Sequence, residues 1–438
     1  MNQIILYSFT FLLLLMLSAC VTKSNVQEKQ NIQDKPIKKR IDPHQWEKSL
    51  VQSMQQFSIG NLPKQPLLKN NFLVGNKDAI NFGYQLFFDK RFSANGKVAC
   101  ATCHKPALYF TDGLRRSLGV ASVKRNAPTI VGVSYSNWFF VDGRADSLWS
   151  QALGPMENEL EHGGNRMQYA HAIYHDLKLK GQYESLFGKF PDLHDKGRFP
   201  NFIGPFSAEM KKNVWDKMRE VDRQAITKIF VNIGKAIASY ETLLKPGSSR
   251  FDDYVKAAKL QDIKKMKELF TNDEAKGLRI FLTKGMCIIC HSGPLFSDFG
   301  FHNIGTPPES TRNLDWGRYT GANSVLKSPF NCFSQYNDDP KKYCDELKYI
   351  VKEKDHTIGA FKTPMLRNVS KTAPYMHAGQ YETLFDVIKH YADPPTTKIG
   401  KSDLLDIELN DQEILQLEKF LHTLDSEINS ESKYLSAP

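Results

Sequence analysis

The chain has 438 residues, of which 41% are hydrophobic and 24% are charged. This length is enough for two or three domains with cores of their own, and the composition is that of an ordinary soluble protein. The formal net charge is +10, but residues 21–45 contribute six basic and only three acidic residues to it. The rest of the charge is too dilute to indicate a nucleic-acid-binding protein, so we expect no nucleic acid among the partners.

The first twenty residues read as an export signal. An apolar run from Ile4 to Leu17 is short for a membrane span and ends in small residues, which predicts a signal peptide over residues 1–19. The sequence Leu17-Ser18-Ala19-Cys20 resembles the lipobox of bacterial lipoproteins, in which the cysteine is lipidated and becomes the mature N-terminus. No Lys or Arg precedes the run, so a plain leader stays open as an alternative. We expect a periplasmic protein that touches the membrane only through a lipid on Cys20.

Residues 20–45 are polar and show no hydrophobic period. Such a segment predicts a flexible tether between a membrane surface and a folded body. The folded part is then expected to begin near residue 46.

Two copies of one short pattern carry most of the functional information. The first is Cys100-Ala101-Thr102-Cys103-His104, and the second is Cys287-Ile288-Ile289-Cys290-His291. A C-x-x-C pair can hold zinc, form a disulfide or act as a redox dithiol. A histidine directly after the pair is typical of covalent c-type haem attachment, in which the two thiols join the haem vinyl groups and the histidine binds the iron. Two copies in an exported chain predict two covalently bound c-type haems.

The surroundings of the two patterns are also similar. An amphipathic stretch up to Phe88 precedes the first, and a helix capped by Thr271 with Glu274 three residues later precedes the second. A long helix over about 222–244 leads into the turn residues 246–249, and a last helix begins near Leu409. Strand signals are few. We therefore predict a mainly α fold of two cytochrome c-like domains, 46–245 and 250–430, each with one covalently attached c-type haem.

Two further cysteines, Cys332 and Cys344, lie twelve residues apart in a polar segment. In an oxidising compartment they would most simply form a disulfide that closes a surface loop. A metal site is a weaker interpretation, because no other ligand types cluster there.

Several ordered blocks between and after the two patterns resemble the bacterial di-haem cytochrome c peroxidase family, and within it the MauG-like branch. The resemblance covers about residues 70–425. The blocks are Arg125–Thr129, Asp142–Ala145, Gln151–Pro155, Glu157–His162, Phe361–Val369 and Thr372–Gly379. The resemblance implies an enzyme that reacts with hydrogen peroxide.

The resemblance implies roles for residues on the side of the first haem. His104 is the proximal iron ligand, and Glu161 matches a distal glutamate, with Gln151 and Pro155 as its pocket neighbours. A carboxylate above an open iron can move a proton between the two peroxide oxygens. Without the surrounding blocks, Glu161 would read as a solvated acid at a helix end.

The resemblance also implies a calcium ion between the two haem domains. Its ligands would be the side chain of Asn126 and the backbone carbonyls of Thr372 and Pro374. Oxygen ligands from two domains suit calcium. The alternative is that Asn126 caps a turn.

The second axial ligand of the second haem decides the branch of the family. His291 is the first ligand, and Tyr391 stands where the cytochrome-oxidising members have methionine. Leu384, Val387, Ile388 and Tyr391 share one helical face after a Thr383 cap, so Tyr391 is expected to point inward and His390 elsewhere. A core tyrosine, or Met365 or Met376 as the ligand, remains an alternative. A phenolate favours ferric and higher states, whereas a thioether favours the ferrous state.

Three departures from the family pattern complete the expectations. The loop 117–124 lacks the distal histidine that many cytochrome-oxidising members carry, Val141 stands where a tryptophan is usual, and residues 324–356 look like an insertion found in a MauG-related group. We therefore expect a peroxide-dependent oxidoreductase whose partner is an exported protein substrate. A peroxidase that takes electrons from a small cytochrome c is the alternative in the same class, and a non-catalytic di-haem electron carrier is the alternative outside it.

Overall fold

The computed structural model describes residues 42–63, 68–310, 312 and 314–438. The predicted signal peptide, Cys20 and nearly all of the predicted tether lie outside these ranges. The chain divides into Met1–Asp42 and a compact unit, Pro43–Pro438. Among the described residues, no helix combines the length and apolarity needed to cross a bilayer.

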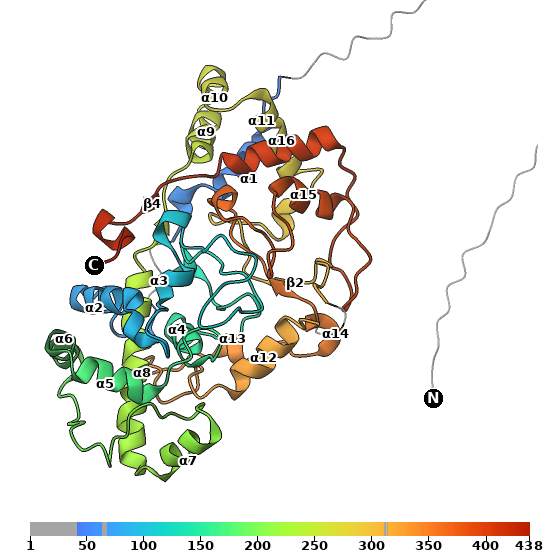
Figure 1. Ribbon diagram of the computed structural model, residues 1–438. Coiled ribbons are helices and arrows are strands. Elements are labelled where there is room, and N and C mark those ends of the chain that lie inside the picture. The colour runs from blue at the N-terminus through green and yellow to red at the C-terminus, as the bar shows by residue number, and fades with distance from the viewer. Residues whose placement is uncertain (1–41, 64–67, 311, 313) are drawn as a thin grey trace, which may run out of the picture. The chain divides into compact units, whose positions relative to one another are not determined.

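The compact unit is mainly helical, as predicted (Figure 1). The helices are α1 (Lys48–Gln56), α2 (Lys77–Phe88), α3 (Cys100–Cys103), α4 (Leu148–Glu157), α5 (Arg166–Tyr174), α6 (Leu177–Phe187), α7 (Glu209–Lys217), α8 (Glu220–Glu241), α9 (Arg250–Lys259), α10 (Ile263–Leu269), α11 (Asn272–Leu282), α12 (Arg318–Lys327), α13 (Asp345–Lys348), α14 (Lys354–Thr357), α15 (Leu384–Ala392) and α16 (Asp411–His422). The strands are two antiparallel pairs, β1 (Lys245–Pro246) with β4 (Ile428–Asn429) and β2 (Phe301–His302) with β3 (Phe361–Lys362).

Side-chain caps explain where the key helices begin. Asn76 accepts hydrogen bonds from the backbone of Asp78 and Ala79 at the start of α2. Thr271 and Glu274 form the predicted capping box of α11, in which the Glu274 carboxylate accepts the Thr271 N–H at 2.7 Å. Thr383 caps α15 by accepting the Asp386 N–H. Each cap satisfies backbone donors that the first helical turn leaves open.

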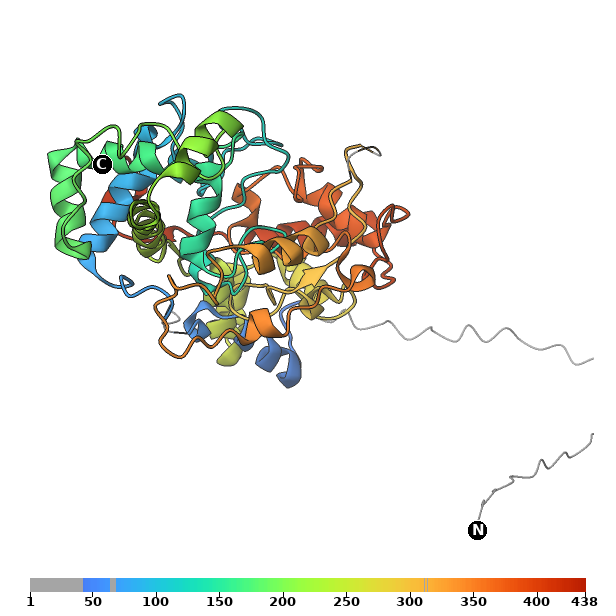
Figure 2. The ribbon, with the colours of Figure 1, turned by 90° about the horizontal axis from the view of Figure 1, so that it is seen from below.

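One cluster of buried residues surrounds α8. Helices α2, α4 and α5 pack against it, and Figure 2 shows α8 nearly end-on between them. The helix that precedes the first C-x-x-C-H pattern, α2, approaches α8 so closely that a side chain at Gly83 would collide with the Ala236 carbonyl. This glycine therefore sets the spacing of the two helices.

A second cluster of buried residues surrounds α11 and α16, with α9 and α15 against it. Its organisation repeats that of the first. The helix before the second C-x-x-C-H pattern, α11, meets α16 at Gly277, where a side chain would collide with the Gln416 carbonyl. The same packing device thus precedes both patterns.

Two observations bear on the predicted N-terminal boundaries. His44, within the predicted tether 20–45, is 1% exposed, and its Nδ1 lies 3.2 Å from the Tyr254 hydroxyl. Helix α1, which the predicted domain 46–245 includes, packs against α9 and belongs to the second cluster. The division into domains 46–245 and 250–430 stays a prediction.

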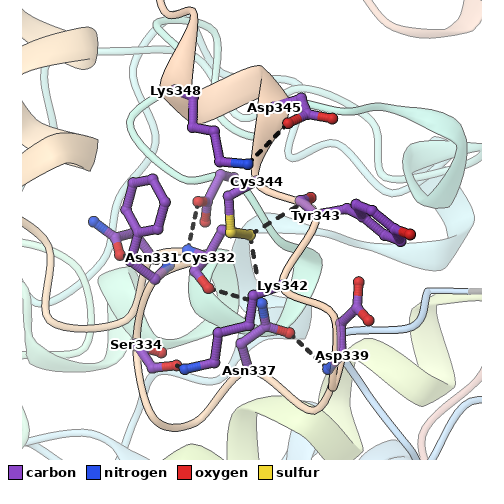
Figure 3. The surroundings of a disulfide bond; sticks show 12 residues. Asn331, Cys332, Ser334, Asn337, Asp339, Lys342, Tyr343, Cys344, Asp345 and Lys348 are labelled. Atoms are coloured by element: carbon purple, nitrogen blue, oxygen red, sulfur yellow. Dashed lines mark hydrogen bonds and ion pairs between the residues drawn. A yellow bond between two sulfur atoms is a disulfide. The ribbon is translucent and has the colours of Figure 1, made fainter.

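The segment predicted as an insertion, 324–356, begins inside α12 and ends inside α14. A disulfide joins Cys332 to Cys344, the pairing that the sequence suggested (Figure 3). Within the loop that it closes, the Asn337 amide donates to the Cys332 carbonyl at 2.7 Å. Cys344 and Leu347 pack with Trp138 and Val325 in a small third cluster.

Candidate functional site

The two C-x-x-C-H patterns fold into the same tight turn. In each, the backbone N–H of the histidine donates to the carbonyl of the first cysteine, His104 to Cys100 and His291 to Cys287, both at 2.9 Å. In each pattern, this hydrogen bond holds the histidine close to the first cysteine.

Both histidines of these patterns are oriented in the same way. Nδ1 of His104 lies 3.0 Å from the Phe110 carbonyl, and Nδ1 of His291 lies 2.9 Å from the Phe296 carbonyl. Because a carbonyl only accepts, Nδ1 carries the proton in both, and Nε2 keeps a free lone pair. Phe110 and Phe296 both have positive φ, +58° and +54°, an uncommon conformation for such residues that recurs at functional sites. Each imidazole is thus held as a metal ligand requires.

Both patterns line one continuous cavity of about 1930 Å³. Pockets for single organic ligands measure about 300–1,000 Å³, so this cavity has room for two large groups. Its walls bring together residues that are far apart in the sequence. They include His104, His291, Glu161, Gln151, Pro155, Tyr391, Asn126, Thr372 and Pro374.

The cysteines do not fit the other interpretations of C-x-x-C. Burial raises the pKa of Cys103 to about 11 and that of Cys287 to about 12. A redox dithiol needs a lowered pKa. A zinc site of four cysteines would need the two C-x-x-C pairs to come together. Within the described ranges they do not, because the one group of three or more His, Cys, Asp or Glu donors close enough for one metal ion is Cys290, Asp298 and His302, which contains a single cysteine. All four cysteines of the patterns are free thiols in the structure.

Glu161 lies in the loop between α4 and α5, on the wall of the cavity. Burial raises the pKa of its carboxyl, and the positive charge of Arg144 opposes that rise. Arg144 also lines the cavity and pairs with Asp142 at 3.1 Å. Burial thus makes the carboxyl hold a proton more readily than an exposed glutamate does, which suits a group that takes up and returns a proton.

The backbone of the Glu161 loop pairs with the loop 117–124. The N–H groups of Val120 and Ala121 donate to the carbonyls of Glu161 and Leu160 at 2.8 and 3.0 Å. A side chain at Gly119 would come within 2.6 Å of both of these carbonyls. The loop that lacks a histidine thus packs directly on the glutamate segment.

Gln151 and Pro155 lie one turn apart on α4 and both line the cavity. The adjoining face of α4, with Leu148, Ala152 and Met156, packs in the first cluster. Helix α4 therefore presents Gln151 and Pro155 to the cavity that Glu161 also borders.

Tyr391 and His390 lie as the helical face predicted. Tyr391 lines the cavity with Leu384, Val387 and Ile388, and burial raises the pKa of its phenol. Nε2 of His390 lies 2.7 Å from the Ile304 carbonyl, and its Nδ1 lies 3.0 Å from the Tyr381 hydroxyl. Because both nitrogens are engaged, His390 is not available as a ligand. Met365 and Met376 also line the cavity.

The cavity wall fits an anionic group. The ammonium of Lys362 donates to Ser136 Oγ at 2.9 Å and to the Trp138 carbonyl at 2.7 Å. Burial lowers its pKa to about 8, and the negative charge of Asp142 opposes that fall. Lys362 also lines the cavity, so its ammonium can interact with an anionic group there. Haem carries an iron, two vinyl groups and two propionates. The two imidazoles suit the iron, the cysteine thiols suit the vinyl groups, and the Lys362 ammonium suits a propionate.

The residues predicted for calcium also border the cavity. The Asn126 amide donates to the Leu114 carbonyl at 2.6 Å, which leaves its side-chain oxygen for another partner. The Asn126 N–H donates to the His377 carbonyl, so this residue ties the two halves of the chain together.

Sequence reasoning missed two groups beside the predicted residues. Arg144 was noticed only as part of a block, although its charge acts on Glu161. His302 lies 2.9 Å from Asp298, and hydrogen bonds to Cys290 and to Asp298 raise its pKa to about 9. No local pattern signals His302, because its position depends on how the chain folds back after the second turn, where the Asp298 N–H donates to the Cys290 carbonyl at 2.8 Å.

The fold and the cavity together define a helical protein with two matched histidine–cysteine sites, which is the class of the di-haem cytochromes. The family model "Di-haem cytochrome c peroxidase" matches residues 77–260. The methylamine utilization protein MauG of Methylophilus methylotrophus is 30% identical over 353 residues, covering 80% of this chain and 82% of that protein. Cytochrome-c peroxidase IdrP1 of Denitromonas iodatirespirans is 29% identical, covering 84% and 86%.

The fold has a counterpart among solved structures. A crystal structure of a MauG-like protein associated with microbial copper homeostasis aligns with a TM-score of 0.56 at 24% identity, over 83% of this chain and 93% of that one. The chain belongs to the di-haem cytochrome c peroxidase family. It is an oxidoreductase of the peroxidase type, and its family implies two haems.

Proposed function

We propose that the chain is an exported peroxidase in which both haems are covalently attached. Cys100 and Cys103 would hold one haem over His104, and Cys287 and Cys290 the other over His291. The observation that carries the proposal is the repeated orientation of the two imidazoles. Both donate through Nδ1 to a phenylalanine carbonyl and keep Nε2 free on one shared cavity.

The first site would react with hydrogen peroxide. A haem held there by Cys100, Cys103 and His104 would supply an iron that can be oxidised by the peroxide. The part played by the protein is proton transfer. The Glu161 carboxylate takes a proton from one peroxide oxygen and delivers it to the other, while Gln151 and Pro155 shape the space around it.

The second site would be closed by Tyr391 opposite His291. A phenolate ligand favours the ferric state, which makes the site a poor acceptor for an electron from a small cytochrome. We therefore favour an exported protein substrate, oxidised from outside the cavity. A peroxidase that takes electrons from a small cytochrome c is the second candidate, because several relatives bear the name cytochrome-c peroxidase.

Three parts of the proposal concern the surroundings of the two sites. The two haem domains would span 46–245 and 250–430. Asn126, with the carbonyls of Thr372 and Pro374, would bind a calcium ion between them. The mature protein would be a periplasmic lipoprotein, anchored through Cys20 after a tether.

A denaturing gel stained for haem, with the mass of the intact chain, tests covalent attachment. We expect a stained band and a mass increase of two haems, whereas Cys287→Ala/Cys290→Ala should leave a mass increase of one. A chain that loses all haem on denaturation would contradict the proposal. The ferric spectrum separates the enzyme from a simple electron carrier, since a carrier would show two fully low-spin haems.

A further inference from the structure

The disulfide-closed loop comes from the second half of the chain but is fastened to the first. The Asp338 carboxylate pairs with the Lys235 ammonium of α8 at 2.7 Å and accepts the Phe72 N–H at 2.9 Å. The Cys332 N–H donates to the Asp146 carboxylate at 2.7 Å. The loop is thus held against the first half on both sides of its turn.

Phe330, two residues before the disulfide, is the part of this segment that enters the first cluster. Its ring lies 6.3 Å from that of Trp149 and 6.2 Å from that of Phe230. The Arg166 guanidinium lies 5.2 Å from the Phe330 ring and 5.2 Å from the Phe230 ring. Phe330 therefore covers a buried arginine at the start of α5.

Arg166 in turn links the two ends of the loop that carries Glu161. Its guanidinium forms a two-pronged ion pair with Glu157, with Nε at 3.0 Å and an Nη at 3.1 Å. The two side chains are only 7% and 8% exposed. Glu157 is the last residue of α4 and Arg166 the first of α5, so this pair joins the two ends of the loop 158–165.

Inside these ends, the loop is fixed by short hydrogen bonds. The Gly163 N–H donates to the Asn158 carbonyl at 2.8 Å, and His162 Nδ1 lies 2.7 Å from the Phe92 carbonyl. The loop is therefore rigid as long as its ends are held together. The surroundings of the Arg166–Glu157 pair keep it from water, and Phe330 is one of the rings that lie against the Arg166 guanidinium.

We propose that the disulfide-closed segment, Ser328–Tyr349, positions Glu161 through Phe330, Arg166 and Glu157. The inference deepens the proposed function and rests on it, since Glu161 is the acid–base group there. Phe330, Arg166 and Glu157 are positioning residues. A misplacement of about 1 Å at a reacting group can cost a hundredfold in rate, so small movements at the loop ends reach the chemistry.

The test compares Phe330→Leu with Phe190→Leu in the haem-loaded protein. Both phenylalanines are buried in the first cluster, but Phe190 packs on Tyr174 and Tyr183, away from Arg166. We expect Phe330→Leu to raise amide hydrogen exchange in residues 158–165 and to slow the reaction with hydrogen peroxide about tenfold. Phe190→Leu should lower stability to a similar degree and change neither. Equal effects of the two variants would overturn the proposal.

A double-variant cycle separates this proposal from the function on which it rests. In a Glu161→Gln background, Phe330→Leu should cause no further loss of peroxide reactivity, because its effect passes through Glu161. Undiminished reactivity of Glu161→Gln itself would refute the proposed function. A normal Glu161→Gln loss with additive Phe330→Leu loss would refute only the positioning.

The disulfide gives an independent variant. Cys332→Ser/Cys344→Ser should raise exchange in residues 158–165 as well as in its own loop. Increased exchange confined to residues 328–349 would contradict the proposal.

Discussion

The two C-x-x-C-H regions share the same turn and histidine orientation, but different residues line the cavity around each of them. In both, a helix packed through a glycine precedes the turn, and the histidine donates to a phenylalanine with positive φ. Near the first turn, the loop between α4 and α5 brings Glu161 to the cavity, whereas near the second turn helix α15 brings Tyr391 to it. Under the proposed function, the repeated turn would hold the same kind of group twice, and the different residues around each turn would decide what each copy does.

The largest expected effect comes from removing the carboxyl group of Glu161. Glu161→Gln keeps the shape but cannot take up a proton, so the rate constant for the ferric protein with hydrogen peroxide should fall by about 10²–10⁴-fold. Stopped-flow absorbance in the Soret region measures it. Glu209→Gln changes an exposed acid that does not line the cavity, so this control variant should react as the unaltered protein does.

Tyr391→Phe tests whether Tyr391 is the second iron ligand of the second haem. Loss of the hydroxyl removes the proposed ligand, so the low-spin signal of one haem should disappear while the other stays as it was. Tyr381→Phe removes only the hydroxyl beside His390 and should leave both signals unchanged. A low-spin signal that survives in Tyr391→Phe would return Met365 and Met376 to consideration.

The charge of Arg144 should set the pH dependence of the first site. The carboxylate must be ionised to take a proton, so the peroxide rate should rise as pH passes the pKa of Glu161. Arg144 lowers that pKa, and therefore Arg144→Leu should move the midpoint of the profile to higher pH. Arg144→Lys, which keeps the charge, should leave it nearly in place. A midpoint that moves equally in both variants would show that the charge is not the cause.

A buried carboxyl beside the first turn gives the smallest effect. Glu241 has one oxygen without a hydrogen-bond partner, and burial raises its pKa to about 8. The folded state therefore binds a proton that the unfolded state releases above about pH 4.5, so this group's contribution to stability falls as pH rises toward 8. Glu241→Gln should raise the melting temperature by a few degrees at pH 8 and little at pH 5. The same gain at both pH values would argue against a titrating Glu241.

Local signals made much of this architecture predictable from the sequence. The residues that form the caps at Thr271 and Thr383 lie within four positions of each helix start, so the sequence alone predicts them. The helical period alone predicts that Tyr391 lies on the inner face. The pairing of Cys332 with Cys344 needed only their spacing in a polar segment.

What the sequence did not show depends on contacts between distant segments. Helix α1 precedes the first cluster in the chain but packs in the second. The charge of Arg144 acts on Glu161 only because the fold brings their segments to one cavity, and Phe330 covers Arg166 across 164 positions of sequence. No periodicity or cap encodes such meetings, since each segment is locally consistent with many partners.

The central claim is that one haem is open above His104 and the other is closed by Tyr391. Electron paramagnetic resonance of the ferric protein tests it most directly. The account predicts one high-spin signal, lost when a strong-field ligand such as cyanide is added, together with one low-spin signal that Tyr391→Phe removes. Two fully low-spin haems in the untreated ferric protein would contradict it.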